Sequence, residues 1–180
     1  MRRGESGLSC LVAVDKPLGL TSHDVVSRVR RSVGERRVGH AGTLDPLATG
    51  VLVVGVGQAT RLLGLLSLDE KGYEALFSFG RETETDDAEG ATRREAPVPP
   101  QLADEAFARR AVEGLVGEVD QVPPAYSAIS VGGRRAYDAA RSGSAVELAP
   151  RHVRILEAGL LAVEEAPVGS LAWRVSLRVS

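Results

Sequence analysis

The chain has 180 residues, 43% of them hydrophobic, and a formal net charge of −2. This length suits one domain with a real core, and no apolar run approaches the length of a membrane span. The single cysteine, Cys10, excludes an internal disulfide and a metal site built from clustered cysteines, and it fits a reducing cytoplasm. Because the net charge is slightly negative, any nucleic-acid-binding surface must be local.

Residues 1–9 are expected to form a disordered leader, and a short apolar strand is predicted over 10–14. A turn over 16–19 then leads to a helix, for which Ser22 is the predicted N-cap and Gly34 the stop signal. Valines recur at helical spacing on one face of this helix, and arginines occupy the other face. The valines are Val25, Val26, Val29 and Val33, and the arginines are Arg28, Arg30 and Arg31.

The stretch 39–52 presents a single aspartate, Asp45, among three glycines. Glycine permits positive φ and close approach of another backbone, and Pro46 pushes Asp45 toward an extended conformation, so no helix runs through it. A buried strand is predicted directly afterwards, over 51–56. A carboxylate on a stiff loop at the edge of a core strand is suited to catalysis, although the pattern also fits a turn aspartate that caps its own loop.

Further elements follow from periodicity. They are a short helix over 59–66, a strand over 73–79, an amphipathic packing helix over 102–116, and strands over 151–163 and 171–180. The segment 80–100, acidic and then rich in proline, is predicted as an exposed loop. The pattern weakens over 122–149, where glycine, serine and arginine predict a mobile segment. Strands interspersed with helices indicate a mixed α/β or α+β sheet.

The stretch 39–52 resembles the catalytic motif of the TruB family, the tRNA pseudouridine synthases that act on a uridine in the T loop (tRNA position 55). Other segments resemble family motifs in the same order along the chain. They are Val14-Asp15-Lys16-Pro17 with Gly19-Leu20-Thr21-Ser22, Lys71-Gly72-Tyr73, the loop 80–90, Pro123-Pro124-Ala125-Tyr126-Ser127-Ala128 and Gly133-Arg134-Arg135-Ala136-Tyr137. The resemblance covers roughly residues 11–180.

The resemblance implies the pseudouridine synthase fold, an α+β fold with a largely antiparallel central sheet flanked by helices. It implies one catalytic domain over 10–180, with a mobile RNA-binding insertion over 122–149, for which an ordinary surface loop is the alternative. The implied partner is the T-arm stem-loop of tRNA in the bacterial cytoplasm. No cofactor, no metal and no membrane contact are implied, and we expect a monomer.

The resemblance makes Asp45 the catalytic carboxylate and Tyr73 the active-site tyrosine, which stacks on a flipped-out base and can move a proton. His40 matches the family histidine that helps to hold the everted RNA. Without the resemblance, Tyr73 fits a core aromatic of a strand, and His40 an ordinary loop residue. Further RNA-binding residues are expected, with solvated surface charges as the alternative. They are Lys16, which has a structural or RNA-contacting role, Arg36, Arg37, Arg134, Arg135 and Arg141.

In the resembled family the last strand continues into a Gly-Thr-Tyr-Ile-Arg-type segment, which supplies a second tyrosine and the arginine that pairs with the aspartate. This chain ends at Ser180, so we expect an incomplete copy of the enzyme. Arg174 and Arg178 share a face of the last strand, without a geometric reason to give either the role of that arginine.

Two other functions compete with this interpretation. The chain fits a non-catalytic tRNA-binding or RNA-folding module, or an inactive truncated fragment, because the arginine that pairs with the aspartate is missing. A carboxylate-dependent glycoside hydrolase is disfavoured, because that chemistry needs two carboxylates flanking one bond. Only Asp45 is presented convincingly, since Asp86 and Asp87 lie in an acidic loop without a suitable partner.

Overall fold

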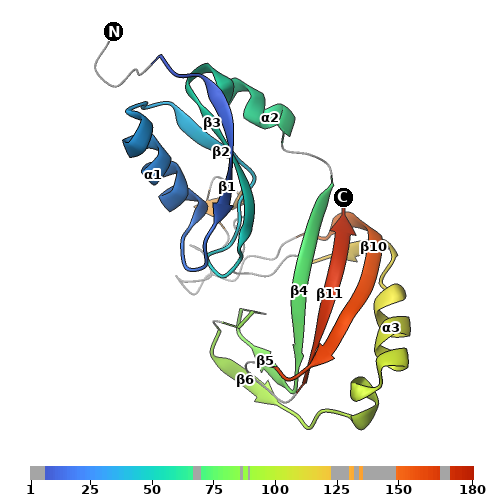
Figure 1. Ribbon diagram of the computed structural model, residues 1–180. Helices are drawn as coiled ribbons and strands as arrows, with labels where there is room; N and C mark the ends of the chain where they lie inside the picture. The colour runs from blue at the N-terminus through green and yellow to red at the C-terminus, as the bar shows by residue number, and fades with distance from the viewer. Residues whose placement is uncertain are drawn as a thin grey trace. The chain divides into compact units, whose positions relative to one another are not determined.

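The structure is a computed structural model. It describes residues 7–66, 70–85, 87–88, 90–122, 149–166 and 171–180, with the backbone alone of 130–131 and 134–135. The chain divides into two units, Met1–Asp69 and Glu70–Ser180, drawn in blue to teal and in green to red (Figure 1). The expectation of one catalytic domain over 10–180 stays a prediction.

Unit 1 is a three-stranded antiparallel sheet with helix α1 on one face (Figure 1). Its strands are β1 (Cys10–Lys16), β2 (Val38–Ala41) and β3 (Gly50–Val56), with β3 in the centre, and α1 spans Ser22–Val33. Val25 and Val26 of α1 are buried against Leu52, Val54 and Val56 of β3. Helix α1 therefore packs on strand β3 through the valine face that the helical spacing predicted.

The start of α1 differs from the prediction. The N-cap is Thr21, whose hydroxyl accepts the Asp24 backbone N–H at 3.1 Å, while the Asp24 carboxylate accepts the Thr21 backbone N–H at 2.9 Å. This reciprocal pair is a capping box. Ser22 is therefore the first helical residue, and its hydroxyl is left for another contact. The predicted end at Gly34 is confirmed, since this residue is left-handed with φ of 63°.

Leu52, Val54 and Val56 lie on the face of β3 that packs against α1, because side chains alternate along a strand. Leu52 is buried whereas Val51 is 70% exposed. The helix predicted over 59–66 is present as a 3-10 helix, η1 (Gly57–Leu62), followed by one helical turn, α2 (Leu63–Leu66). Leu63 packs directly on two glycines of the sheet, since a Cβ atom added at Gly39 or Gly55 would lie 3.0 or 3.1 Å from its side chain. Packing, rather than positive φ, requires glycine at these two positions.

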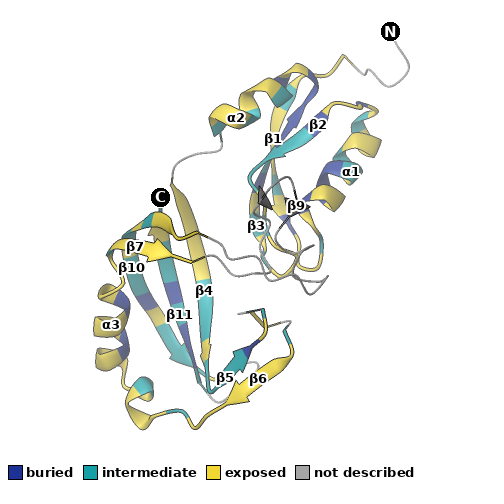
Figure 2. Ribbon diagram, turned by 180° about the vertical axis from the view of Figure 1, so that it is seen from behind, coloured by how far each residue is buried: buried dark blue, intermediate teal, exposed yellow. Residues whose placement is uncertain are grey.

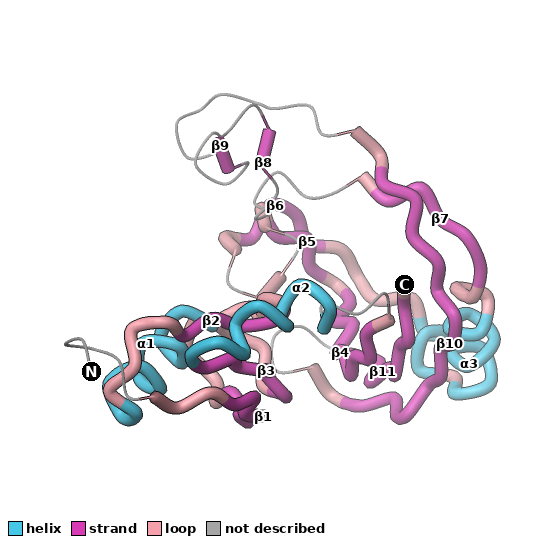
Figure 3. Tube along the Cα trace, turned by 90° about the horizontal axis from the view of Figure 1, so that it is seen from above, coloured by secondary structure: helices cyan, strands magenta, loops and turns pink. Residues whose placement is uncertain are grey.

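Unit 2 is built on a four-stranded antiparallel sheet in the order β4-β11-β10-β7, with α3 along one face (Figure 3). The elements are β4 (Lys71–Phe79), β7 (Gly117–Gln121), β10 (Arg151–Glu164), β11 (Leu171–Val179) and α3 (Glu105–Glu113). Ala108 and Val112 of α3 pack in one cluster with Trp173 and Val175 of β11. Figure 2 shows this core as dark blue segments on α3 and β11.

Two predictions for unit 2 need correction, and one strand of this unit was missed. The helix expected over 102–116 begins later, because Asp104 caps α3 by accepting the Phe107 N–H at 2.7 Å, and a separate 3-10 turn, η2 (Pro100–Ala103), precedes it. The loop expected over 80–100 contains an antiparallel pair of strands, β5 (Arg81–Thr83) and β6 (Thr92–Glu95). Strand β7 was not predicted. Because β6 is fully exposed and β7 nearly so, neither carries the apolar alternation that marks a half-buried strand.

Parts of the expected leader and insertion lie outside the described residues. These parts are residues 1–6 of the leader, and residues 123–129, 132–133 and 136–148 of the insertion. Within the insertion, β8 (Ser130–Val131) pairs antiparallel with β9 (Arg134–Arg135). Every strand pair that the structure describes is antiparallel, so the expected α+β class with antiparallel sheets is confirmed. No described helix has both the length and the apolar character needed to cross a bilayer.

Candidate active site

Asp45 lies on the loop between β2 and β3, with its side chain exposed and its neighbours held on both sides. On the preceding side, the Ser22 hydroxyl accepts the Leu44 N–H at 2.9 Å and donates to the Leu44 carbonyl at 3.1 Å. On the following side, the Pro46 carbonyl accepts the Gly19 N–H at 2.8 Å. The loop is non-helical at Asp45, as predicted, and these contacts give its stiffness a physical basis.

The glycines around Asp45 serve two purposes. Gly42 and Gly50 have φ of 93° and 134°, a region that L side chains rarely adopt, so they let the chain turn into and out of the loop. Gly39 has no such conformation and instead lies under Leu63. Positive φ at Gly42 and Gly50 agrees with the predicted use of glycine, whereas at Gly39 a side chain, that of Leu63, approaches closely and not another backbone.

Lys16 is completely buried at the end of β1. Its Nζ donates to the carbonyls of Leu20 at 2.7 Å, Pro17 at 3.1 Å and Pro46 at 3.4 Å. An ammonium has three donors, and backbone carbonyls take all three. No carboxylate among the described residues forms an ion pair with it. Lys16 thus links β1 and the following turn to the Asp45 loop by hydrogen bonds. These contacts favour a structural role for Lys16 over an RNA-contacting one.

His40 lies half-buried on β2, and its Nδ1 hydrogen-bonds to the Gly42 carbonyl. A carbonyl can only accept, so Nδ1 is the donor of this bond, and Nε2 is the ring nitrogen left for another partner. The exposed ring of His23 on α1 meets the His40 ring edge-on, with centroids 5.4 Å apart at 80°. The structure thus brings a second imidazole, which was not predicted, to the histidine of the motif.

Within unit 1, the Asp45 carboxylate makes no hydrogen bond or ion pair with any residue that the structure describes. Arg174 and Arg178 of β11 are instead engaged by glutamates of unit 2. Arg174 pairs with Glu164 at 2.6 Å and with Glu74 at 3.1 Å. The hydrogen bond to Glu164, and after it the one to Glu74, raises the pKa of Arg174 above its ordinary value. Arg178 pairs with Glu157 at 2.5 Å. Neither guanidinium is left without an anion in its own sheet.

Arg36 and Arg37 are exposed in the segment between α1 and β2. Arg30 fastens this segment to the helix, because its Nε donates to the Arg36 carbonyl and its Nη2 to the Val38 carbonyl, both at 3.1 Å. The buried carboxylate of Glu35 accepts the Arg37 N–H at 3.0 Å. The two side chains that were predicted to bind RNA are therefore solvent-accessible on a backbone with fixed contacts.

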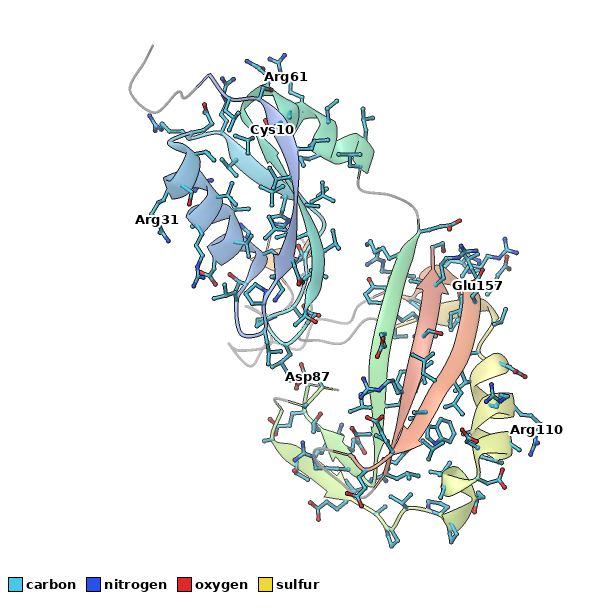
Figure 4. The ribbon with its side chains drawn as sticks, in the orientation of Figure 1. Cys10, Arg31, Arg61, Asp87, Arg110 and Glu157 are labelled. Carbon is cyan, nitrogen blue, oxygen red and sulfur yellow. The ribbon has the colours of Figure 1, made fainter. Side chains whose placement is uncertain are left out.

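A further arginine and a hollow lie on unit 1 near these residues. The side chain of Arg31 extends from the outer side of α1, away from the sheet (Figure 4). A hollow of about 270 Å³ lies beside Arg37. Its other lining residues are Gly7, Leu8, Ser9, Glu35, Gly57 and Gln58.

Tyr73 lies on β4 in unit 2, opposite Leu177 of β11. Its side chain is 47% exposed, whereas Phe79 on the same strand packs edge-on against Trp173, with ring centroids 4.7 Å apart. The alternative of a buried core aromatic therefore fits Phe79 better than Tyr73. The side chains of Arg134 and Arg135, and all of Arg141, lie outside the described residues, so their RNA contacts stay predictions.

The sequence matches one family over most of its length. Residues 30–180 match the model for the TruB family pseudouridylate synthase (N terminal domain). The chain belongs to the TruB family. It is 57% identical over 153 residues to tRNA pseudouridine synthase B of Mycobacterium sp. (strain KMS), covering 85% of this chain and 51% of that protein. The enzyme of the same name from Thermobifida fusca (strain YX) is 58% identical over 147 residues, covering 82% and 50%. The chain spans about half the length of these TruB relatives.

Solved structures confirm the fold that TruB membership implies. A chain in the crystal structure of a Cbf5–Nop10–Gar1 complex matches with a TM-score of 0.65 and 24% identity, over 97% of this chain and 40% of that chain. A chain in the structure of an H/ACA RNP bound to a substrate RNA containing 2′-deoxyuridine matches with a TM-score of 0.59 and 22% identity, over 94% and 37%. At these identities the likeness shows the fold.

Sequence reasoning missed the contact of Ser22, which it interpreted as a helix cap. The spacing of Thr21 and Asp24, with two residues between them, is that of a capping box, and it could have identified Thr21 as the cap. Ser22 would then have been an unexplained polar residue at the start of a buried helix face. The approach of Leu44 to it, 22 positions along the chain, has no local signal.

Proposed function

We propose that this TruB protein converts uridine to pseudouridine in the T loop of tRNA, at tRNA position 55. One observation carries the proposal: Asp45 presents an exposed carboxylate on a loop whose backbone is hydrogen-bonded on both sides of it. Asp45 and its loop lie within residues 30–180, which match the family model. A catalytic group needs such a fixed position to act on a bound substrate.

The reaction breaks the bond between uracil N1 and ribose C1′ and forms a bond between C5 and C1′. The base loses its C5 hydrogen to solvent and gains one at N1, so no oxidant and no second substrate is consumed. Asp45 supplies the carboxylate, either as a nucleophile or by stabilising positive charge that develops on the ribose. Both roles require an ionised, accessible side chain, and the exposed carboxylate of Asp45 supports them.

The target uridine must leave the stacked RNA loop before a carboxylate can reach it. We propose that Tyr73 stacks on the flipped base, a contact worth roughly 1–3 kcal/mol. Its ring is half exposed, which leaves a face available for a base. We assign His40 to holding the RNA in the everted conformation through Nε2, since its Nδ1 is already bonded to Gly42.

Phosphates of the T-arm are proposed to bind Arg36 and Arg37, with Arg134, Arg135 and Arg141 of the segment 122–149 contributing further contacts. Arginine and lysine contacts to phosphate supply sequence-independent affinity. The slight negative charge of the whole chain makes such a local cluster necessary. We propose that the protein acts as a monomer, without a metal or an organic cofactor.

One observation favours a second function, that of a non-catalytic tRNA-binding module. The Asp45 carboxylate has no cationic partner among the described residues of unit 1, although a nearby cation would keep it ionised. This alternative predicts RNA binding without isomerisation.

Tritium release separates the two functions, because the isomerisation frees the hydrogen at C5. The substrate is a T-arm hairpin labelled at C5 of its uridines, and the control is the same hairpin with cytidine at the target position. We expect release from the first hairpin and none from the second. Equal binding of both hairpins without release would support the binding module and contradict the enzyme.

A further inference from the structure

The hydroxyl of Ser22 makes two contacts to one residue of the Asp45 loop. It accepts the Leu44 N–H at 2.9 Å and donates to the Leu44 carbonyl at 3.1 Å. A hydroxyl has one donor and two acceptor positions, so a single side chain satisfies both backbone groups. Ser22 is only 1% exposed, and water therefore cannot replace these bonds without opening the structure.

Holding the Leu44 carbonyl fixes the peptide plane that leads into Asp45, because the atoms of a peptide unit are coplanar. The next peptide plane ends at Pro46, whose ring locks φ and restricts Asp45 itself to extended conformations. The Pro46 carbonyl is held in turn by Gly19 and Lys16. Rotation about the side-chain bonds is then the main freedom that Asp45 retains.

Two further contacts make the N-terminal turn of α1 a firm support. Leu44 packs its side chain against the core between α1 and the sheet, so the residue is fastened by its side chain as well as its backbone. The capping box of Thr21 and Asp24 stabilises the helical turn that carries Ser22. The support and the loop are thus separate segments, joined by the Ser22 hydroxyl and by the packing of the Leu44 side chain.

We propose that Ser22 is a positioning residue for Asp45: its hydroxyl sets the direction in which the carboxylate leaves the loop. The inference rests on the proposed function, because only catalysis by Asp45 gives this orientation a purpose. Ser22 touches neither substrate nor the reacting atoms. Its removal loosens the peptide plane before Asp45 and lowers the population of loops that present the carboxylate correctly.

The test compares Ser22→Ala with Thr21→Ala, measured by amide exchange and by single-turnover tritium release from the T-arm hairpin. Thr21→Ala is the matched control, since it removes the cap of the same helix without touching Leu44. In the wild-type protein the Leu44 amide should exchange slowly, although it lies in a loop. We expect the Leu44 amide to exchange about tenfold faster in Ser22→Ala than in Thr21→Ala. The single-turnover rate of Ser22→Ala should fall about tenfold or more. Its binding of the hairpin should not change. Ser22→Thr, which keeps the hydroxyl, should recover part of the protection.

Three results would overturn the inference. The first is that the Leu44 amide of the wild-type protein already exchanges at the rate of an open loop. This result alone would contradict the inference, so the test does not depend on whether Ser22→Ala folds. The second is equal exchange and equal turnover in Ser22→Ala and Thr21→Ala, while Asp45→Asn is inactive; the proposed function then stands without the positioning role. The third is full turnover by Asp45→Asn, in which case the proposed role of Asp45 fails, and the positioning role with it.

Discussion

The Nζ of Lys16 donates to the carbonyl of Pro46, 30 positions along the chain, at 3.4 Å. A fully buried ammonium therefore holds the residue that follows Asp45, while its other donors bond to the turn after β1. This contact joins two segments that resemble family motifs and explains why a charged side chain lies in the interior. Its hydrogen bonds to three carbonyls replace those that water would give.

Replacing Lys16 by Met should destabilise the protein by on the order of 2–4 kcal/mol, since three backbone carbonyls lose a charged donor. Lys16→Arg should also be destabilising, because the larger planar guanidinium cannot take the place of a compact ammonium without moving its surroundings. Denaturant unfolding measures both effects. Lys71→Met is the control, since Lys71 is exposed and its loss should change stability by less than about 0.5 kcal/mol. Equal stability of the two methionine variants would contradict the anchoring role.

The exposure of Tyr73 predicts that its hydroxyl matters for turnover and not for folding. Tyr73→Phe keeps the ring, so it should bind the T-arm hairpin normally and change stability by less than about 0.5 kcal/mol, while single turnover slows. Tyr73→Leu should in addition weaken binding by up to about 1–3 kcal/mol, the value of one stacked base. Full activity of Tyr73→Phe would remove the hydroxyl from proton transfer.

Arg36 and Arg37, changed together to Ala, should weaken RNA binding and flatten its salt dependence. Two lost phosphate contacts should reduce the slope of log K against log salt by about 1–2. The control is the double change of Arg109 and Arg110, which are exposed on α3; Figure 4 shows Arg110 directed away from the sheet. Similar slopes for the two double variants would mean that total charge, and not this site, attracts the RNA.

The capping box predicts a pH dependence for α1. Hydrogen bonds from the Thr21 side chain and then its backbone N–H hold the pKa of Asp24 below its ordinary value of 3.8. A carboxylate with a lowered pKa stabilises the folded protein at any pH above its ordinary pKa. This stabilisation is lost as the pH falls through the lowered pKa. Wild type should therefore be more stable than Asp24→Asn at about pH 6, and the difference should shrink below about pH 4. A difference that stays constant down to about pH 2 would exclude this carboxylate as its source.

The main elements of each unit could be predicted because their apolar residues repeat with a clear period. The valines of α1 recur at helical spacing, and β11 alternates strictly from Leu171 to Val179. The Asp45 loop was likewise evident from its glycines and from Pro46. These signals are local, and each depends on only a few neighbouring residues.

What the sequence did not show depends on contacts between distant positions. The Ser22 to Leu44 and Lys16 to Pro46 bonds cross 22 and 30 positions, so no pattern within a window records them. Strand β2 was missed because its four residues, Val38–Ala41, are too few to show a period. The sequence pointed to the Asp45 loop and to a structural or RNA-contacting role for Lys16, but not to the partners of Lys16 or to the contact of Ser22.

The most direct test of the account is Asp45→Asn, compared with wild type for pseudouridine formation in the T-arm hairpin. The matched control is Asp15→Asn, which removes another exposed carboxylate of unit 1. We predict that Asp45→Asn loses turnover while its hairpin affinity stays within about twofold and its stability within about 0.5 kcal/mol, because the carboxylate bonds to no described residue. Asp15→Asn should behave as wild type. Turnover by Asp45→Asn at the wild-type rate would contradict the account, because the carboxylate on the anchored loop would then take no part in the reaction.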